Sequence, residues 1–296
     1  MSEGRARVGE LELAYETIGE PSGEPLLLVM GLGMQLIHWD RELCELFAER
    51  GFHVIRFDNR DAGLSTKVDA PVPNVLALMS GIPARVPYRL DDMAADTFGL
   101  LDELGIERAH VVGTSMGGMI AQTMAIRQPE RVLSLASMLS TTGDRRVGTP
   151  RLRVWSVLMR RAPRGRDSFV EYFVRVFGMI GSPAYRADEE RARELAEATY
   201  DRGVHPAGTA RQLGAILASG SRTAALKKLS VPTVVIHGEA DPLVPLRAGL
   251  ATARAIPDAE LVRIPGMGHD MPRELWPTFV DAISRNAERA RERAPA

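Results

Sequence analysis

The stretch RAHVVGTSMGGMIAQTMA, residues 108–125, decides the fold that this sequence predicts. Its apolar run at 109–113 is typical of a strand buried on both faces, and the pattern at 116–128 predicts a helix that ends before Pro129. Between them, Gly113-Thr114-Ser115-Met116-Gly117 matches G-x-S-x-G. That pattern between a strand and a helix indicates a nucleophile elbow, which projects the serine Oγ above a sheet. An ordinary glycine–serine turn is the alternative, so the elbow needs chemical partners elsewhere in the chain.

Strand and helix patterns alternate on both sides of this stretch. Alternation predicts a mostly parallel sheet with helices on both faces, an α/β fold. From 141 to about 230 only helical patterns occur, which predicts a helical cap inserted after the sixth strand, with an N-terminal hairpin counted as two. We therefore expect a core of residues 1–140 and 231–296 and a cap of residues 141–230. The other expected strands are 11–19, 26–31, 53–58, 131–139, 232–238 and 259–266, and the other expected helices outside the cap are 38–50, 89–106, 246–255 and 272–290.

Composition excludes several classes of protein. The chain has 296 residues, 45% of them hydrophobic, and a net charge of −1, which gives no pull toward nucleic acid. Cys44 is the single cysteine, so no intrachain disulfide can form, and its helical surroundings predict a small core residue. No apolar stretch of about 18 residues predicts a membrane span, and no apolar leader is visible, so we expect a cytoplasmic protein. The sequence does not indicate an oligomeric state.

A serine at its normal pKa needs a base, and that base needs an acid to orient it. Of the six histidines, His269 differs because it lies in the glycine-rich IPGMGHD loop just after the last predicted strand. Asp241 lies in HGEADPLVP, three residues past the end of the preceding strand, and we expect the nearby Glu239 to face solvent or cap the turn. We predict Ser115 as nucleophile, Asp241 as acid and His269 as base. The histidines expected to have packing or structural roles are His38, His53, His110 and His237, while His205 falls in the cap.

An acyl-transfer site also needs two N–H groups for the oxyanion that develops during the reaction. The Met116 N–H lies at a predicted helix N-terminus and is one candidate. The other comes from the loop after the strand at 26–31, where we choose the Leu32 N–H and expect Gly31 and Gly33 to let the backbone approach the substrate. A plain glycine turn is the alternative. This loop lacks the last glycine of a dinucleotide fingerprint, and neither a P-loop nor H-E-x-x-H occurs, so we expect no cofactor and no metal.

These motifs resemble the α/β-hydrolase family over nearly the whole chain outside the expected cap. The segments that carry the resemblance are LLLVMGLG, HVIRFDNRDAGLST, AHVVGTSMGGMIAQ, TVVIHGEADPLVP and IPGMGH. Within the family they are most similar to the branch that contains aclacinomycin methylesterase and actinobacterial carboxylesterase- and lipase-like proteins. The resemblance implies a covalent acyl-enzyme on Ser115, with His269 as base and then acid, Asp241 as its orienting partner, and an oxyanion hole from Leu32 and Met116. One departure is Met30, where many relatives have histidine before the glycine.

We therefore expect a serine carboxylic-ester hydrolase that acts on small to medium apolar esters, methyl esters among them. Two alternatives stay open: a cofactor-free perhydrolase, haloperoxidase-like enzyme or carbon–carbon bond hydrolase using the same three residues, and a ligand-binding receptor with slow turnover. Residues 74–88 are expected to form a loop with one short helix, either part of a lid or simply covered. Some apolar cap side chains are expected to line the substrate pocket while others only pack: Trp155, Met159, Phe169, Tyr172, Phe173, Phe177, Met179 and Tyr185.

Overall fold

The computed structural model describes residues 2–149, 154, 163–185 and 188–293, and within them one eight-stranded sheet forms the centre of the molecule. The strand order is β1-β2-β4-β3-β5-β6-β7-β8. β2 pairs antiparallel with both β1 and β4. All the other pairs, from β4–β3 to β7–β8, are parallel. The predicted fold class is confirmed. The strands are β1 (Ser2–Val8), β2 (Leu11–Ile18), β3 (Glu24–Val29), β4 (Phe52–Phe57), β5 (Ala109–Thr114), β6 (Val132–Met138), β7 (Thr233–Gly238) and β8 (Glu260–Ile264).

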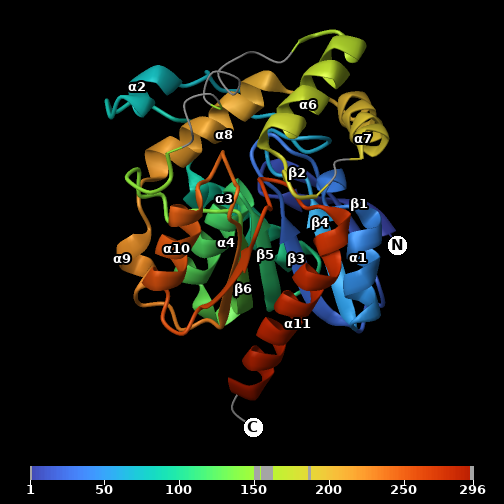
Figure 1. The fold of residues 1–296 in the computed structure, drawn as a ribbon, viewed down its shortest axis with the longest axis vertical. Coiled ribbons are helices and arrows are strands. Elements are labelled where there is room, and N and C mark those ends of the chain that lie inside the picture. The colour runs from blue at the N-terminus through green and yellow to red at the C-terminus, as the bar shows by residue number, and fades with distance from the viewer. Residues whose placement is uncertain (1, 150–153, 155–162, 186–187, 294–296) are drawn as a thin grey trace.

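Helices cover both faces of the sheet (Figure 1). α1 (Arg41–Glu49) and α11 (Trp276–Arg293) pack on one face, and α3 (Leu90–Glu103), α4 (Met116–Arg127) and α10 (Leu246–Ala255) on the other. Alternate side chains of β3 point to opposite faces of the sheet, so this strand contributes to the core on both faces. Leu27 and Val29 join the cluster under α3 and α4, while Leu26 and Leu28 join the cluster under α1 and α11, and all four are fully buried. This double burial explains why the strand appears in the sequence as an uninterrupted apolar run.

Between β6 and β7 the described residues form helices and no strand. These are α6 (Arg166–Ile180), α7 (Glu189–Asp201), α8 (Pro206–Ser219) and the short α9 (Thr223–Leu226). α6, α7 and α8 lie together at one end of the molecule, above the sheet, while α9 lies beside α10 (Figure 1). The assignment of residues 141–230 to a separate cap stays a prediction.

Several element boundaries differ from the predicted ones for local reasons. α1 begins later than expected because the Asp40 side chain accepts a hydrogen bond from the Glu42 N–H (2.9 Å), which fixes the helix start. A separate 3-10 turn, η1 (Leu36–His38), precedes it, and η3 (Arg273–Leu275) precedes α11 in the same way. The other 3-10 turn is η2 (Pro129–Arg131). The segment 74–88 does contain one short helix, α2 (Val75–Met79).

Two further observations bear on the predictions from composition. Cys44 is free and fully buried in α1, and burial raises the pKa of its thiol to about 12, as expected of a packed core residue. Within the part of the chain that the structure describes, no helix is both long and apolar enough to cross a membrane.

Candidate active site

Ser115 lies at the sharp turn between β5 and α4. Its backbone has φ 55° and ψ −118°, a positive φ that L-residues rarely adopt. Two hydrogen bonds hold the turn in place: the Ser115 N–H donates to the Met138 carbonyl oxygen (2.9 Å), and the Ser140 hydroxyl donates to the Ser115 carbonyl oxygen (2.7 Å). The neighbouring strand β6 and the residues just after it thus support a strained conformation at Ser115, as expected of a nucleophile elbow.

The glycines on both sides of Ser115 are required by close backbone approach. A Cβ on Gly113 would overlap the carbonyl group of Gly117, the second residue of α4. A Cβ on Gly117 would overlap the carbonyl oxygen of Val29 at the end of β3. Both obstacles are backbone atoms, which cannot move aside as the end of a side chain can. The G-x-S-x-G spacing therefore reflects how tightly α4 packs against β3 and β5.

We expect Gly117→Ala to destabilise the protein by at least about 1–3 kcal/mol, because the new methyl group must displace the Val29 carbonyl. A matched control is Gly178→Ala in α6, where an added Cβ meets no described atom within 4 Å. That variant should be up to about 1 kcal/mol more stable, because alanine favours a helix interior over glycine. Urea unfolding of both variants checks the prediction, and equal midpoints for Gly117→Ala and the unmodified chain would contradict it.

Ser115, His269 and Asp241 form one chain of hydrogen bonds. His269 Nε2 lies 3.1 Å from Ser115 Oγ, and His269 Nδ1 lies 2.7 Å from Asp241 Oδ2. The Asp241 side chain is fully buried and that of His269 is 8% exposed, so little water competes for these contacts. Both are hydrogen-bonding distances, and the one between His269 and Ser115 is short enough for direct proton transfer. The structure thus brings together the three residues that the sequence analysis singled out, from loops that follow β5, β7 and β8.

Backbone groups hold the acid and the base in position. Asp241 Oδ1 accepts hydrogen bonds from the N–H groups of Leu243 and Val244, both at 2.8 Å, which leaves Oδ2 directed at the imidazole. The His269 N–H donates to the carbonyl oxygen of Ile180 (2.7 Å) at the end of α6. The loop that carries the histidine is therefore tied to the helices between β6 and β7.

Glu239 and His237 have other partners than Ser115 and His269. Glu239 forms an ion pair with Arg263 (2.7 Å). His237 is fully buried in β7 and its Nε2 donates to the Val244 carbonyl oxygen (2.8 Å). Burial lowers the pKa of His237, which keeps that imidazole neutral behind Asp241. No group of three or more histidine, cysteine, aspartate or glutamate side chains is arranged to hold a metal within the described residues.

The loop after β3 passes close to Ser115 at Gly31, the residue before Leu32. A Cβ on Gly31 would lie 3.2 Å from the Ser115 Cβ, so a larger residue there would crowd the nucleophile. The Met34 N–H donates to the Gly31 carbonyl oxygen (3.2 Å) and Gly33 has φ 69°, which together are typical of a type II turn. The Leu32 N–H donates to no group among the described residues. We call residues 31–36 the oxyanion loop.

Met116 supplies the second N–H that is free of backbone partners. It is the first residue of α4, where an N–H has no acceptor within its own helix. The helix dipole adds partial positive charge at this end. The N–H groups of Leu32 and Met116 therefore donate to no group among the described residues, and they stay candidates for the oxyanion donors.

Gly33 also makes contacts with α8 that the sequence did not indicate. A Cβ on Gly33 would lie 2.8 Å from Thr209 Oγ1 on α8, and the Gly33 N–H donates to the Gln212 side chain (2.8 Å). Gly33 therefore allows the close approach of α8 and the positive φ of the turn.

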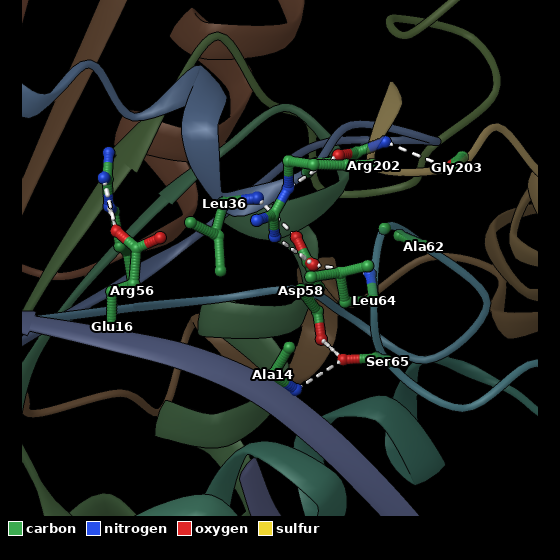
Figure 2. Close-up of polar contacts among 12 residues, drawn as sticks. Ala14, Glu16, Leu36, Arg56, Asp58, Ala62, Leu64, Ser65, Arg202 and Gly203 are labelled. Carbon is green, nitrogen blue, oxygen red and sulfur yellow. Dashed lines mark hydrogen bonds and ion pairs between the residues drawn. The ribbon is translucent and has the colours of Figure 1, made fainter. Parts of the chain in front are cut away.

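Several residues that hold the oxyanion loop were missed in the sequence. Asp58, just after β4, is fully buried and accepts hydrogen bonds from the N–H groups of Leu36 (2.6 Å) and Leu64 (2.8 Å). Arg202, at the end of α7, forms an ion pair with Asp58 (2.7 Å), as Figure 2 shows. The Asn59 amide donates to the Met30 carbonyl oxygen (3.1 Å), just before the loop. For Asp58 and Asn59 the only signal in the sequence is their place directly after a buried strand, and Arg202, at the end of a helix, has no such signal.

Most of the aromatic cap residues that the structure describes pack against one another or the core. Phe169 and Phe173 are buried in a small cluster between α6 and α7, and Phe173 stacks on Phe177 with ring centroids 4.2 Å apart. Tyr185 packs against the cluster under α1 and α11. Trp155 and Met159 lie outside the described residues.

Comparisons with known proteins agree with this geometry. A family model described as alpha/beta hydrolase fold matches residues 24–272. Rhodomycin D methylesterase DauP of Streptomyces sp. (strain C5) is 31% identical over 95% of this chain and 96% of that protein. Rhodomycin D methylesterase DnrP of Streptomyces peucetius is 30% identical with the same coverage. The solved structure of a meta-cleavage product hydrolase from Pseudomonas fluorescens IP01 aligns over 97% of this chain and 98% of that one, with a TM-score of 0.76 at 22% identity, which is a likeness of fold.

Proposed function

The chain belongs to the α/β-hydrolase family, and from that premise we propose that it is a serine carboxylic-ester hydrolase that works through an acyl-enzyme on Ser115. The observation that carries the proposal is the hydrogen-bonded chain Ser115–His269–Asp241. The N–H groups of Leu32 and Met116, which donate to no group in the part of the chain that the structure describes, support it. A nucleophile, a base, an acid and an oxyanion site are the four parts that ester hydrolysis by this mechanism needs.

In the first half of the reaction His269 Nε2 takes the proton of Ser115 Oγ as that oxygen attacks the ester carbonyl carbon. The carbonyl oxygen becomes an oxyanion, which the N–H groups of Leu32 and Met116 stabilise. Asp241 accepts the Nδ1 hydrogen of His269, which fixes the tautomer and stabilises the imidazolium. The tetrahedral intermediate then expels the alcohol, which takes the proton from His269, and the acyl group stays on Ser115.

In the second half a water molecule replaces the serine as nucleophile. His269 takes one proton from that water as its oxygen attacks the acyl carbon, and the same two N–H groups hold the second oxyanion. When the intermediate collapses, the carboxylic acid leaves and Ser115 Oγ recovers its proton from His269. All protons are returned, so the site needs no co-reactant except water.

Methyl esters are the first substrates to test, because the two methylesterase relatives match almost the whole chain at about the same identity. A panel with one apolar acyl group and methyl, ethyl, butyl and phenyl alcohols separates the possibilities. Hydrolysis with the highest kcat/KM for the methyl ester supports a methylesterase, and a preference for longer alcohols supports a general carboxylesterase. If no ester turns over in the folded protein, the proposal fails, and peracid formation, carbon–carbon bond hydrolysis and simple ligand binding become the activities to measure.

A further inference from the structure

Gln212 on α8 connects the helices between β6 and β7 to the oxyanion loop. Its side chain is fully buried, and both ends of its amide are bonded. Gln212 Oε1 accepts the Gly33 N–H (2.8 Å), and Gln212 Nε2 donates to the Arg60 carbonyl oxygen (2.7 Å). One side chain thus fastens the loop after β3 to the loop after β4. An amide buried with both ends satisfied is oriented by its partners and in turn orients them.

The hydrogen bond to Gly33 acts on the part of the turn that is easiest to rotate. Turns of types I and II differ mainly in the orientation of the peptide between the second and third residues, here Leu32 and Gly33. The N–H of that peptide belongs to Gly33, and Gln212 Oε1 is its acceptor. The hydrogen bond therefore selects the orientation that the structure shows, and with it the backbone angles at Leu32.

The other contacts to the oxyanion loop act at its ends. Asn59 holds the Met30 carbonyl just before the loop, and Asp58 holds the Leu36 N–H at its last residue. At Gln35 the side-chain amide donates to carbonyl oxygens at the end of α7, and this contact also lies beyond the turn. Among the described residues, Gln212 is the one whose side chain hydrogen-bonds to the peptide between Leu32 and Gly33.

We infer that Gln212 is a positioning residue for the oxyanion hole, through its hydrogen bond to the peptide that follows Leu32. This inference rests on the proposed function, since it assigns the Leu32 N–H to the developing oxyanion. Its consequence is that a helix above the active site helps to stabilise the transition state, besides covering the substrate. Loss of the Gln212 hydrogen bond should leave substrate binding intact and weaken the interaction made only in the transition state.

The test compares Gln212→Leu, which keeps the volume and removes both hydrogen bonds, with Thr209→Ala. Thr209 lies on the same helix and contacts the same glycine, but its side chain does not bond the Gly33 N–H. We expect Gln212→Leu to lower kcat about 10- to 100-fold with KM within about twofold, since removal of a complete oxyanion donor costs about 10²–10³ in kcat. Thr209→Ala should stay within about threefold of the unmodified chain, because the turn keeps its acceptor.

Two readouts separate positioning from a merely structural role. A trifluoromethyl ketone, which forms an oxyanion on the serine, should bind Gln212→Leu more weakly by the same factor as kcat falls, while the matching methyl ketone binds unchanged. Amide hydrogen exchange of the substrate-free chain should become faster at residues 31–36 in Gln212→Leu only. An unchanged kcat, an equal loss for both ketones, or unchanged exchange at 31–36 would each overturn the inference. Amide hydrogen exchange can be measured without any enzyme activity. It therefore tests whether Gln212 positions residues 31–36 even if the unmodified chain hydrolyses no ester.

Discussion

Replacing Ser115 by alanine should lower ester hydrolysis by about 10⁴-fold or more in kcat while the protein stays folded. The reason is geometric: Ser115 Oγ is the atom within 3.1 Å of His269 Nε2, and alanine leaves the base with no nucleophile to activate. Substrate affinity should change little, because the acyl and alcohol groups bind elsewhere in the site. A fluorophosphonate probe, which reacts with activated serines, should label the unmodified chain and leave Ser115→Ala unlabelled.

Ser140→Ala is the matched control for this experiment. Ser140 lies close to the elbow, and its hydroxyl donates to the Ser115 carbonyl oxygen, so the variant removes a neighbouring serine while the nucleophile stays. It should lose some stability and keep both labelling and turnover. Full labelling of Ser115→Ala, or turnover of that variant within tenfold of the unmodified chain, would refute the assignment of the nucleophile.

Asp241→Asn should lower kcat by about 10⁴-fold, comparable to loss of the serine. The asparagine keeps the size of the side chain, but its amide cannot act as the charged acceptor for His269 Nδ1–H. It also favours the wrong imidazole tautomer, with the proton on the nitrogen that faces Ser115. The imidazolium that forms in the transition state would then have no carboxylate beside it. A kcat measurement against pH checks this, and rates should stay low at every pH at which the chain is folded.

Glu239 provides the control for the acid, since it is the other carboxylate in the same loop. Its partner is Arg263, 2.7 Å away on β8, and the side chain is 33% exposed. Glu239→Gln should therefore keep kcat within about twofold, because a surface ion pair of this kind contributes at most about 1 kcal/mol to stability and nothing to the proton transfer. If Glu239→Gln lost as much activity as Asp241→Asn, the assignment of the acid would be wrong.

The sequence was sufficient for the candidate site residues that lie in the loops after predicted strands. Ser115, Asp241 and His269 each lie in such a loop, and loops at the carboxyl ends of parallel strands converge at one edge of the sheet. Chain order and local glycines were enough to select them from the many serines and acids. The fold class followed from the same alternation of strands and helices.

The residues that hold the oxyanion loop could not be found this way, because their partners are far away in the chain. Gln212 bonds a residue 179 positions earlier, and Arg202 pairs with an aspartate 144 positions earlier. In the sequence each is an ordinary polar residue in or next to a predicted helix. Their role depends on how α7 and α8 pack above the sheet, which no local pattern specifies. Gly33 shows the same limit: the sequence singled out this glycine, but it did not predict the contact with Thr209 on α8.

In the proposed mechanism Ser115 carries the acyl group during ester hydrolysis, and peptide mass mapping of the chain trapped during turnover is the most direct test. The chain is mixed with a p-nitrophenyl ester whose bulky acyl group slows the second half of the reaction, then quenched in acid and digested. We expect a burst of one p-nitrophenol per chain, and a mass increase equal to the acyl group on the peptide that contains Ser115. The corresponding peptide of Ser115→Ala should show no mass increase. Steady release of product with no acylated peptide, or an acyl group on any other residue, would contradict it.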